Sequence, residues 1–497
     1  MTGNRTTRRD FIKAAGGAAA GLALGCYGVL PSEAASEGER PNILFVIADD
    51  WSYPHAGVYG DKVIKMPNFD RVAREGILFT NSFCAAPTCT ASRAGVVTGQ
   101  AIHRLDEGAN LFCFLPGRFR VYPEILEAAG YSVGLTGKGW GPGPLEGSGR
   151  TRNPAGPPFK DFRTFIQQSP KDKPFCFWVG SHFPHRNYEP GSGVKSGMRL
   201  EDVQVPPFLP DTPEVRGDIL DYYYAAEQFD KQVGAVLNTL EESGRAENTL
   251  VVVTSDNGMP FPRSKGNLYG IGTHMPLAIR WPARVKAGRK VDDFVSHTDF
   301  APTFLEAAGL KPLPEMTGKS IMDLLCADQP ARRDSVVTER ERHTNCRVGD
   351  ASYPSRALRT HDFLYVRNFE PDRWPAGDPK MWKAVGDFGD IDTSPSKAVI
   401  LDRRDDPKIK PFFDLATAKR PAEELYDLKK DPCELHNVAD EPDYAGIKQK
   451  LGRRLDTWMA KTADPRTVNP HDDRWDTYAY FGSTEPWIFP KPPKTKP

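Results

Sequence analysis

Two short apolar runs, each ended abruptly by acidic or amide side chains, constrain the fold of this chain more than any other feature. Residues 42–48 read NILFVIA and precede Asp49-Asp50, and residues 249–254 read TLVVVT and precede Ser255-Asp256-Asn257-Gly258. Uninterrupted apolar runs of this length are typical of strands that are buried on both faces. Both runs therefore predict central strands of a sheet that is covered on each side.

Helical stretches between these runs predict an α/β fold. Residues 123–129 and 219–243 have helical patterns, and residues 175–179 are a third apolar strand candidate. Strands that alternate with helices favour a large, mostly parallel sheet sandwiched by helices. Ligands bind beyond the carboxyl ends of the strands in such sheets, so the acidic side chains after the two runs predict the position of the functional site.

The length of the chain implies more than one domain. Its 497 residues exceed the roughly 250–300 at which one hydrophobic core stops growing. After about residue 330, short strand-like pieces such as 363–366 precede a charged helix near 444–461. We expect long Pro- and Gly-rich surface loops at 151–158 and 184–213. The expected parts are a catalytic domain at 41–330, a smaller α+β domain at 331–480 and a Pro-rich tail at 481–497.

The overall charge argues against nucleic acid or an anionic membrane as a partner. The chain has 65 Lys and Arg residues and 65 Asp and Glu residues, so it lacks a global field of either sign. Any anionic substrate must therefore be held by local charge.

The first 34 residues predict an export signal. Residues 7–13 read TRRDFIK, which is typical of a twin-arginine signal, and an Ala/Gly-rich apolar run continues to about residue 30. That run is short beside the ~20 apolar residues that a spanning helix needs, so we expect a cleaved peptide, the twin-arginine machinery as a partner, and a periplasmic or secreted protein. Cys26 leaves a lipoprotein as the less favoured alternative, because Ala23 and Leu24 fit that pattern poorly.

The other cysteines show no metal-binding spacing. The chain has eight cysteines, and none forms a C-x-x-C pair. An oxidising destination permits disulfides, whereas export of an already folded protein favours buried free thiols, and the sequence leaves both interpretations open.

Cys89 is the strongest nucleophile candidate. The segment 89–93 reads CTASR and opens a predicted helix that ends at Thr98-Gly99. A side chain at a helix N-terminus faces free N–H groups and the positive end of the helix dipole, which suits an oxyanion substrate. A structural cysteine is the alternative for this residue taken alone.

Together these motifs resemble those of the sulfatase family. The signature of that family is Cys-x-Pro/Ala-x-Arg, whose cysteine is oxidised after translation to formylglycine, and Cys89-Thr90-Ala91-Ser92-Arg93 matches it. The resemblance extends from Pro41 to about Ala439. It implies an alkaline phosphatase-like α/β fold with a smaller C-terminal domain, and hydrolysis that starts from hydrated formylglycine.

The resemblance also implies the metal site. Asp49 and Asp50 resemble the paired metal aspartates of sulfatases, and Asp256 and Asn257 resemble the second pair, with the modified Cys89 as a further ligand. Four oxygen ligands suit a hard cation, Ca²⁺ before Mg²⁺. Taken alone, each pair would be an ordinary turn or helix cap.

Basic residues and histidines complete the site implied by the resemblance. Arg93 would hold the formylglycine, while Lys138 and Lys265 would contact the sulfate. His182 and His185 follow the strand candidate at 175–179; His185 would protonate the leaving group and His182 would line the pocket, although their roles are interchangeable at this stage. The sequence departs from the family at Trp140, where histidine is common, which places one polar contact in doubt.

Further segments resemble the sulfamidase branch of the family and predict a sulfated-glycan substrate. These are residues 256–269 and 208–218, and residues 424–428 resemble the general C-terminal signature. Arg342 and His343 are candidate sugar contacts, with a solvated charge cluster as the alternative. The sugar, O- versus N-sulfate, exo or endo action and the oligomeric state are left open.

Two other functions compete with this interpretation. A phosphonate or phosphate monoester hydrolase of the same superfamily also fits the motif, and a non-catalytic glycan-binding relative would explain Trp140 but not the remaining site residues. Ala91 predicts modification by a formylglycine-generating maturase that accepts alanine at this position, in the cytosol before folded export.

Overall fold

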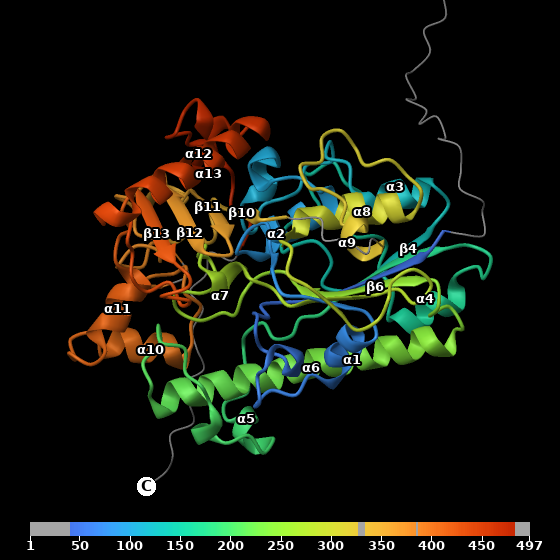
Figure 1. Ribbon diagram of the computed structural model, residues 1–497, viewed down its shortest axis with the longest axis horizontal. Coiled ribbons are helices and arrows are strands. Elements are labelled where there is room, and N and C mark those ends of the chain that lie inside the picture. Colours follow the sequence, from blue (N-terminus) through green and yellow to red (C-terminus); the bar gives the residue numbers. More distant parts are fainter. Residues whose placement is uncertain (1–39, 327–332, 384–385, 483–497) are drawn as a thin grey trace, which may run out of the picture.

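The computed structural model describes residues 40–326, 333–383 and 386–482, so the predicted signal at 1–34 and nearly all of the tail at 481–497 lie outside the described residues. Figure 1 shows a large sheet layered between helices, with a second, smaller sheet beside it. This arrangement confirms the predicted fold class.

The large sheet has seven strands and is mostly parallel. Its four neighbouring strands β4, β5, β1 and β6 run parallel, whereas β7 is antiparallel to both β6 and β2, and β2 pairs in parallel with β8. The antiparallel β7 follows β6 without a full crossover helix, and a parallel partner would need one. In spatial order the strands are β4 (Ser132–Gly137), β5 (Phe175–Gly180), β1 (Asn42–Ala48), β6 (Thr249–Ser255), β7 (Leu277–Arg280), β2 (Ile77–Phe79) and β8 (Arg289–Val291).

Strand β1 is apolar throughout because both of its faces are buried. Leu44 and Val46 belong to the core on one face, and Phe45 and Ile47 belong to the core on the other. Successive side chains of a strand point to opposite faces, so a strand between two helix layers needs no polar face.

Helices cover both faces of the sheet (Figure 1). One layer consists of α1 (Pro67–Arg74), α4 (Phe162–Gln168) and α6 (Pro213–Glu242). The other consists of α2 (Cys89–Thr98), α3 (Tyr122–Ala128), α8 (Phe300–Ala307) and α9 (Met322–Cys326). Helix α6 starts six residues earlier than the sequence pattern predicts, because Thr212 caps it by accepting the Val215 N–H at 3.4 Å and Pro213 suits a first helical turn.

The second sheet is antiparallel and packs against α12 (Ala445–Lys461). Its strands are β10 (Ser335–Arg340), β11 (Ser355–Thr360), β12 (Phe363–Asn368) and β13 (Glu423–Asp427), in that order. Helices α10 (Pro395–Asp402) and α11 (Lys410–Thr417) lie between β12 and β13 in the chain, and α10 contacts α6 of the first layer. The remaining short elements are β3 (Ser82–Phe83), β9 (Val295–Ser296), α5 (Ser192–Lys195), α7 (Gly270–Thr273) and α13 (Arg474–Thr477).

The seven described cysteines are all free thiols, which favours the second of the two interpretations of the cysteine pattern for these residues. Among the described helices, none combines the length and the apolar character that crossing a bilayer requires.

Candidate active site

The carboxyl ends of the parallel strands β4, β5, β1 and β6 and the N-terminus of α2 converge at one edge of the large sheet. Asp49 and Asp50 follow β1, and Asp256 follows β6, whose last residue pairs with the last residue of β1. Cys89 is the first residue of α2. Asp50 has φ of 75°, a left-handed conformation that is uncommon outside glycine, and its backbone N–H is held by Asp256 Oδ1 at 3.1 Å.

The acidic side chains and Cys89 form one buried cluster. Ligand atoms of Asp49, Asp50, Cys89 and Asp256 all lie within 4.8 Å of one another, and all four residues are buried. The Cys89 thiol donates to Asp49 Oδ1 at 3.4 Å. These are the residues that the motifs place together, and the structure brings them into contact.

The cluster fits a hard divalent cation. Asn257 donates its amide to Asp50 Oδ1 at 2.7 Å, while its own Oδ1 is buried without a hydrogen-bond partner among the described residues. Burial, and the neighbouring Asp49 and Asp256, raise the pKa of Asp50 although Lys265 opposes the shift. A buried set of crowded carboxylates with an orphan amide oxygen is the donor set that Ca²⁺ or Mg²⁺ takes, and a cation would relieve the repulsion.

Two lysines neutralise part of this charge. Lys138 Nζ donates to both oxygens of Asp49 at 2.7 Å, and Lys265 Nζ donates to Asp50 Oδ2 at 2.8 Å. Burial lowers the pKa of Lys138, but Asp49, Cys89 and Asp256 together outweigh burial, and the net pKa lies above the ordinary value. Both ammonium groups therefore stay charged beside Cys89.

Arg93 holds the strand ends in place. Its guanidinium is fully buried, donates to Asp256 Oδ2 at 2.7 Å and reaches three backbone carbonyls, those of Ala48, Lys138 and Gly139. None of its hydrogen bonds goes to Cys89. Arg93 thus positions the ends of β1, β4 and β6 rather than gripping the nucleophile directly.

The Cys89 thiol is a poor nucleophile as encoded. Burial, together with Asp49 and Asp256, raises its pKa well above the usual range despite the two lysines. The thiolate is the reactive form of cysteine, so a thiol in this environment stays inert near neutral pH. A chemical modification at this position would remove that limit.

His185 lies over the cluster, and His182 lies beside it. The His185 Nδ1–H donates to the Arg186 carbonyl at 2.5 Å, so its Nε2 is the free nitrogen, and that atom is 4.0 Å from Asp50 Oδ2. The His185 side chain is 42% exposed, which leaves room for a substrate above it. Burial lowers the pKa of His182, and no side chain or carbonyl of the described residues forms a hydrogen bond with its ring.

Trp140 is buried in the apolar core on the α2 side of the sheet. It is 3% exposed, and its Nε1 has no hydrogen-bond partner among the described residues. The indole therefore takes no part in the hydrogen-bonded cluster of Lys138, Asp49 and Asp50.

The structure corrects the interpretation of Arg342. Its guanidinium is fully buried and donates to the carbonyls of Tyr478 at 2.7 Å and Asp350 at 3.3 Å, so it ties the C-terminal segment down and has no face toward a sugar. His343 is also buried, 3.3 Å from Asp390 Oδ1, but it packs against Gly266 next to Lys265 and so lies close behind the site.

One residue of the site has no counterpart in the predicted set. Asp392 lies between β12 and α10, and its Oδ2 is 3.5 Å from Lys265 Nζ. No local motif marks this aspartate in the sequence, and only the packing of α10 on α6 brings it to the site.

A second acidic group is structural. His103, Glu339 and Asp464 also lie within reach of one another, but Arg356 pairs with Glu339 at 3.0 Å and with Asp464 at 2.7 Å. A guanidinium already supplies the positive charge there, so this triad offers no place for a metal ion.

Comparison with known proteins adds to this geometry. The sulfatase family model matches residues 41–142 and 158–310, and a model described as N-sulphoglucosamine sulphohydrolase, C-terminal, matches residues 264–378. The chain is 30% identical over 482 residues to human N-sulphoglucosamine sulphohydrolase, a match that covers 87% of this chain and 92% of the human protein. It is 29% identical over 456 residues to an ulvan-active sulfatase of Formosa agariphila, covering 87% of this chain and 82% of that protein.

Solved structures agree on the fold. A protein in complex with its substrate D-glucosamine-2-N,6-O-disulfate superposes with a TM-score of 0.63 at 20% identity, over 86% of this chain and 99% of that one. At this identity the likeness concerns the fold alone.

Proposed function

Because this chain belongs to the sulfatase family, we propose that it hydrolyses sulfate esters or N-sulfate groups of sulfated glycans, with formylglycine formed from Cys89 as the nucleophile. The observation that carries the proposal is the place of Cys89, at the N-terminus of α2 and inside a buried cluster of three aspartates. Relatives named for ulvan and for N-sulphoglucosamine support glycans as the substrate class.

A divalent cation, Ca²⁺ before Mg²⁺, belongs to the proposal. Asp49, Asp50, Asp256 and Asn257 would hold it, because they present buried carboxylate oxygens and an unpartnered amide oxygen at one point. When bound, the cation would supply Lewis-acid stabilisation of negative charge, and formylglycine would supply a hydroxyl nucleophile that cysteine lacks.

The remaining residues bind the sulfate and move one proton. Lys138 keeps its charge because of Asp49, and Lys265 keeps its charge because of Asp392 and Asp50, so both can neutralise the sulfuryl oxygens. His185 exposes its Nε2 above the cluster while its Nδ1–H is fixed on a backbone carbonyl, so in the imidazolium form it can donate the Nε2 proton to the departing oxygen or nitrogen. Arg93 keeps Asp256 and the strand ends rigid during this chemistry.

We also propose the place and order of maturation. The twin-arginine pattern at 7–13 supports export of an already folded protein to the periplasm or beyond, so a maturase would act on Cys89 in the cytosol. Ala91 favours a maturase that accepts alanine within the motif. Expression with and without such a maturase tests this order, and full conversion without it would refute it.

Mass spectrometry and sulfate release test the central proposal together. The peptide that contains Cys89 should show the mass loss of the thiol-to-aldehyde conversion, and purified protein should release sulfate from a panel of sulfated saccharides. Cys89→Ala should abolish release, and Cys84→Ala, at another buried cysteine, is the matched control. An active protein that retains the Cys89 thiol would refute the proposal.

Matched sulfate and phosphate monoesters separate the runner-up function. A phosphate or phosphonate hydrolase would prefer the phosphorus compound, and a glycan-binding protein without activity would carry an unmodified thiol. A preference for the sulfate ester by the converted protein would exclude both.

A further inference from the structure

One carboxylate at the active site, that of Asp392, helps to keep Lys265 charged but takes no direct part in the chemistry proposed above. The Oδ2 atom of Asp392 is buried without a hydrogen-bond partner among the described residues, although Lys265 Nζ lies 3.5 Å away. The side chain as a whole is 28% exposed, so part of it is open to solvent beside Lys265.

The loop that carries Asp392 is rigidly held. Two backbone neighbours are fixed by Lys397, whose Nζ donates to the carbonyl of Ile391 at 2.8 Å and to that of Phe388 at 3.2 Å. Asp390 pairs with the buried Arg340 at 2.8 Å. A side chain whose backbone is fixed in this way is preorganised to receive a ligand.

The charge of Asp392 limits what it can bind. Burial opposes its ionisation, but Lys265, His185 and other cations outweigh burial and lower its pKa to about 2. An ionised carboxylate only accepts hydrogen bonds, and it repels a bare anion. Beside a sulfate group, the donors that a saccharide offers are its ring hydroxyls.

We propose that Asp392 determines sugar specificity by accepting a hydrogen bond from a ring hydroxyl next to the sulfated position. The inference rests on the proposed function, because it requires the sulfate to lie between Lys138 and Lys265. Asp392 contacts the substrate away from the reacting bond, so its effect should follow the sugar and not the chemistry.

The test compares a sugar substrate with one that has no hydroxyl to offer. For Asp392→Ala, kcat/KM on a sulfated monosaccharide, taken relative to kcat/KM on 4-nitrophenyl sulfate, should fall by about 10- to 100-fold, as expected for a hydrogen bond to a charged acceptor. Asp405→Asn, which changes an exposed carboxylate between α10 and α11, is the matched control and should change kcat/KM on neither substrate.

Deoxy analogues of the same monosaccharide sharpen the test. The kcat/KM of wild type should fall by a similar factor on the analogue that lacks the recognised hydroxyl. The kcat/KM of Asp392→Ala should not fall further on that analogue, because the substitution and the missing hydroxyl remove the same interaction. Equal loss on the sugar and on the aryl sulfate would overturn the proposal and assign Asp392 to positioning Lys265, and no loss on either would overturn it too. Aryl sulfate turnover and formylglycine content report separately on the proposed function.

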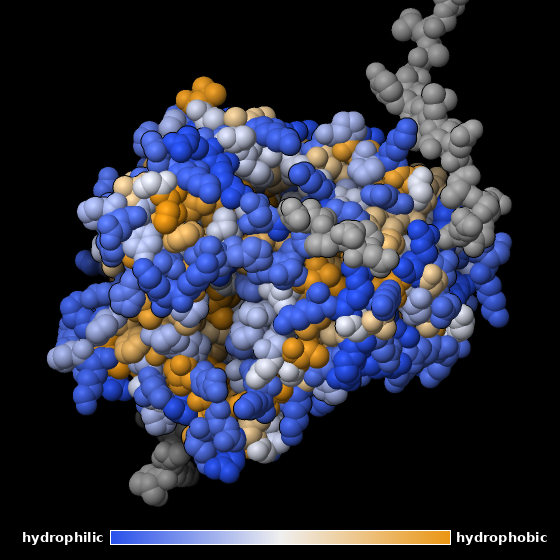
Figure 2. All heavy atoms as spheres, viewed as in Figure 1, coloured by the Kyte–Doolittle hydropathy of each residue, from blue (hydrophilic) through white to orange (hydrophobic). Residues whose placement is uncertain are grey.

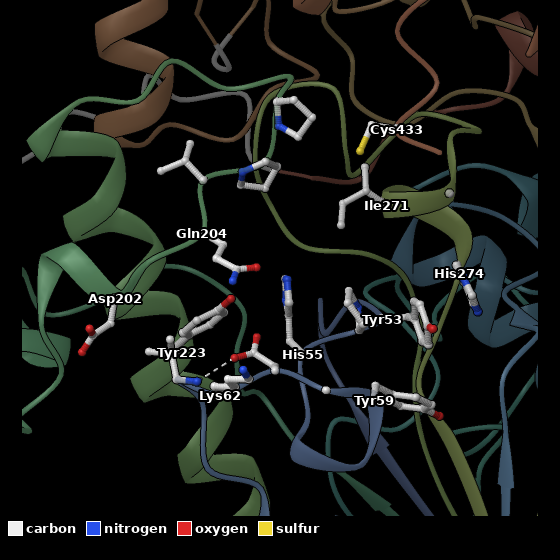
Figure 3. A pocket seen from close by; sticks show the side chains of 18 of the residues that line it. Tyr53, His55, Tyr59, Lys62, Asp202, Gln204, Tyr223, Ile271, His274 and Cys433 are labelled. Atoms are coloured by element: carbon white, nitrogen blue, oxygen red, sulfur yellow. Dashed lines mark hydrogen bonds between the residues drawn. The ribbon is translucent and has the colours of Figure 1, made fainter. Parts of the chain in front are cut away.

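A second inference comes from a cavity away from the catalytic cluster. The cavity has a volume of about 1170 Å³, and none of the predicted catalytic or metal residues lines it. Figure 3 shows His55 and Gln204 pointing into the same space, with Tyr53 and Tyr223 at its sides, and Figure 2 shows the molecular surface hollowed near α7. Ile271 and Cys433 lie on its far side in Figure 3.

His55 directs a hydrogen-bond donor into this cavity. The Ser52 N–H donates to the Tyr222 hydroxyl at 3.1 Å, so the hydroxyl proton is free to be donated to His55 Nδ1 at 3.2 Å. Burial lowers the pKa of His55 to about 4, and the neutral ring then carries its proton on Nε2. Nothing among the described residues accepts that proton, although only 7% of the residue is exposed.

Charged side chains of both signs line the cavity. The ammonium groups of Lys62 and Lys65 form no hydrogen bond or ion pair within the described parts of the chain. The carboxylates of the lining, in contrast, accept backbone N–H groups or lie beside arginines; these are Asp61, Asp202, Glu227 and Glu434. Lys62 and Lys65 are therefore the cations of the lining that are left to pair with an anionic group of a ligand.

We infer that this cavity binds a further sulfated unit of the glycan chain. The two ammonium groups suit the sulfate, and the His55 donor and the Gln204 amide suit the hydroxyls of the sugar ring. This inference too rests on the proposed function, and it predicts a preference for oligosaccharides over single sugars.

Removing the two lysines tests the inference without touching the core. The Lys62→Ala/Lys65→Ala variant should raise KM for a sulfated hexasaccharide prepared from heparin by about five- to tenfold at low salt, as two exposed charge contacts allow, and leave turnover of 4-nitrophenyl sulfate unchanged. Lys160→Ala/Lys450→Ala, at two other exposed lysines, is the control. Unchanged KM for the hexasaccharide, or an equal rise in the control, would overturn the inference; Gln204→Leu provides a second, uncharged variant with the same expected direction.

Discussion

Replacing Arg93 by methionine should destabilise the protein by about 5 kcal/mol. The guanidinium is fully buried and its loss would leave Asp256 without its partner at 2.7 Å. Breaking a buried ion pair from one side costs about 3–5 kcal/mol, and each buried carbonyl that loses its donor adds about 1 kcal/mol. Three carbonyls lose a donor, those of Ala48, Lys138 and Gly139. Because these effects overlap, we expect about 5 kcal/mol rather than their full sum.

Urea unfolding followed by tryptophan fluorescence and far-ultraviolet circular dichroism measures this loss. The urea midpoint should fall while the m-value stays unchanged. The free energy of unfolding lost in this way is a large part of the roughly 5–15 kcal/mol that is typical of a folded domain. The control is Arg163→Met, which removes an exposed pair with Glu242 at 2.8 Å and should cost less than about 1 kcal/mol. If the two variants were equally stable, with or without added Ca²⁺, the structural role of Arg93 would be refuted.

Three further outcomes are expected. Burial lowers the pKa of His297 to about 3, so the folded state resists a proton that the unfolded chain takes up near pH 6.5. The free energy of unfolding should therefore be highest at neutral pH and should fall as the pH falls, by about 2 kcal/mol at pH 5. Urea unfolding of His297→Gln should show a correspondingly flatter pH dependence. Thr212→Ala should lower the unfolding free energy by about 1 kcal/mol because α6 loses its cap, whereas Thr457→Ala on the exposed face of α12 should change it little. Added Ca²⁺ should raise the thermal midpoint, because at 100 times the dissociation constant it adds about 2.7 kcal/mol to the free energy of unfolding. Asn257→Leu should weaken that response. A thermal midpoint that does not change with Ca²⁺ would refute the cation site.

The core of the large sheet could be predicted because its signal is local. Residues 42–48 and 249–254 are apolar at every position, and the structure buries them on both faces as β1 and β6. Their carboxyl ends carry Asp49, Asp50 and Asp256, and adjacent parallel strands bring those residues together in any such sheet. The buried cluster of Asp49, Asp50, Asp256 and Cys89 therefore follows from short motifs and one rule of sheet topology.

Other features depend on contacts between distant segments. Arg342 reads as a free basic residue in the sequence, yet the C-terminal segment covers it and takes its hydrogen bonds. Asp392 is one aspartate among many in its stretch of chain, and it becomes part of the site because α10 packs on α6 and Ser396 donates to Asp218 at 2.6 Å. No periodicity or spacing marks either outcome.

The sequence by itself determined the strands, the acidic ends that follow them and the Cys89 motif, because each depends on residues adjacent in the chain. The tertiary structure alone decided how charge is distributed around that motif: which carboxylate each cation neutralises, that Arg93 serves the strand ends, and that Asp392 stands beside Lys265. The physical reason is that electrostatic pairing depends on distance in space and on burial, and neither is set until the two sheets and their helices have packed together.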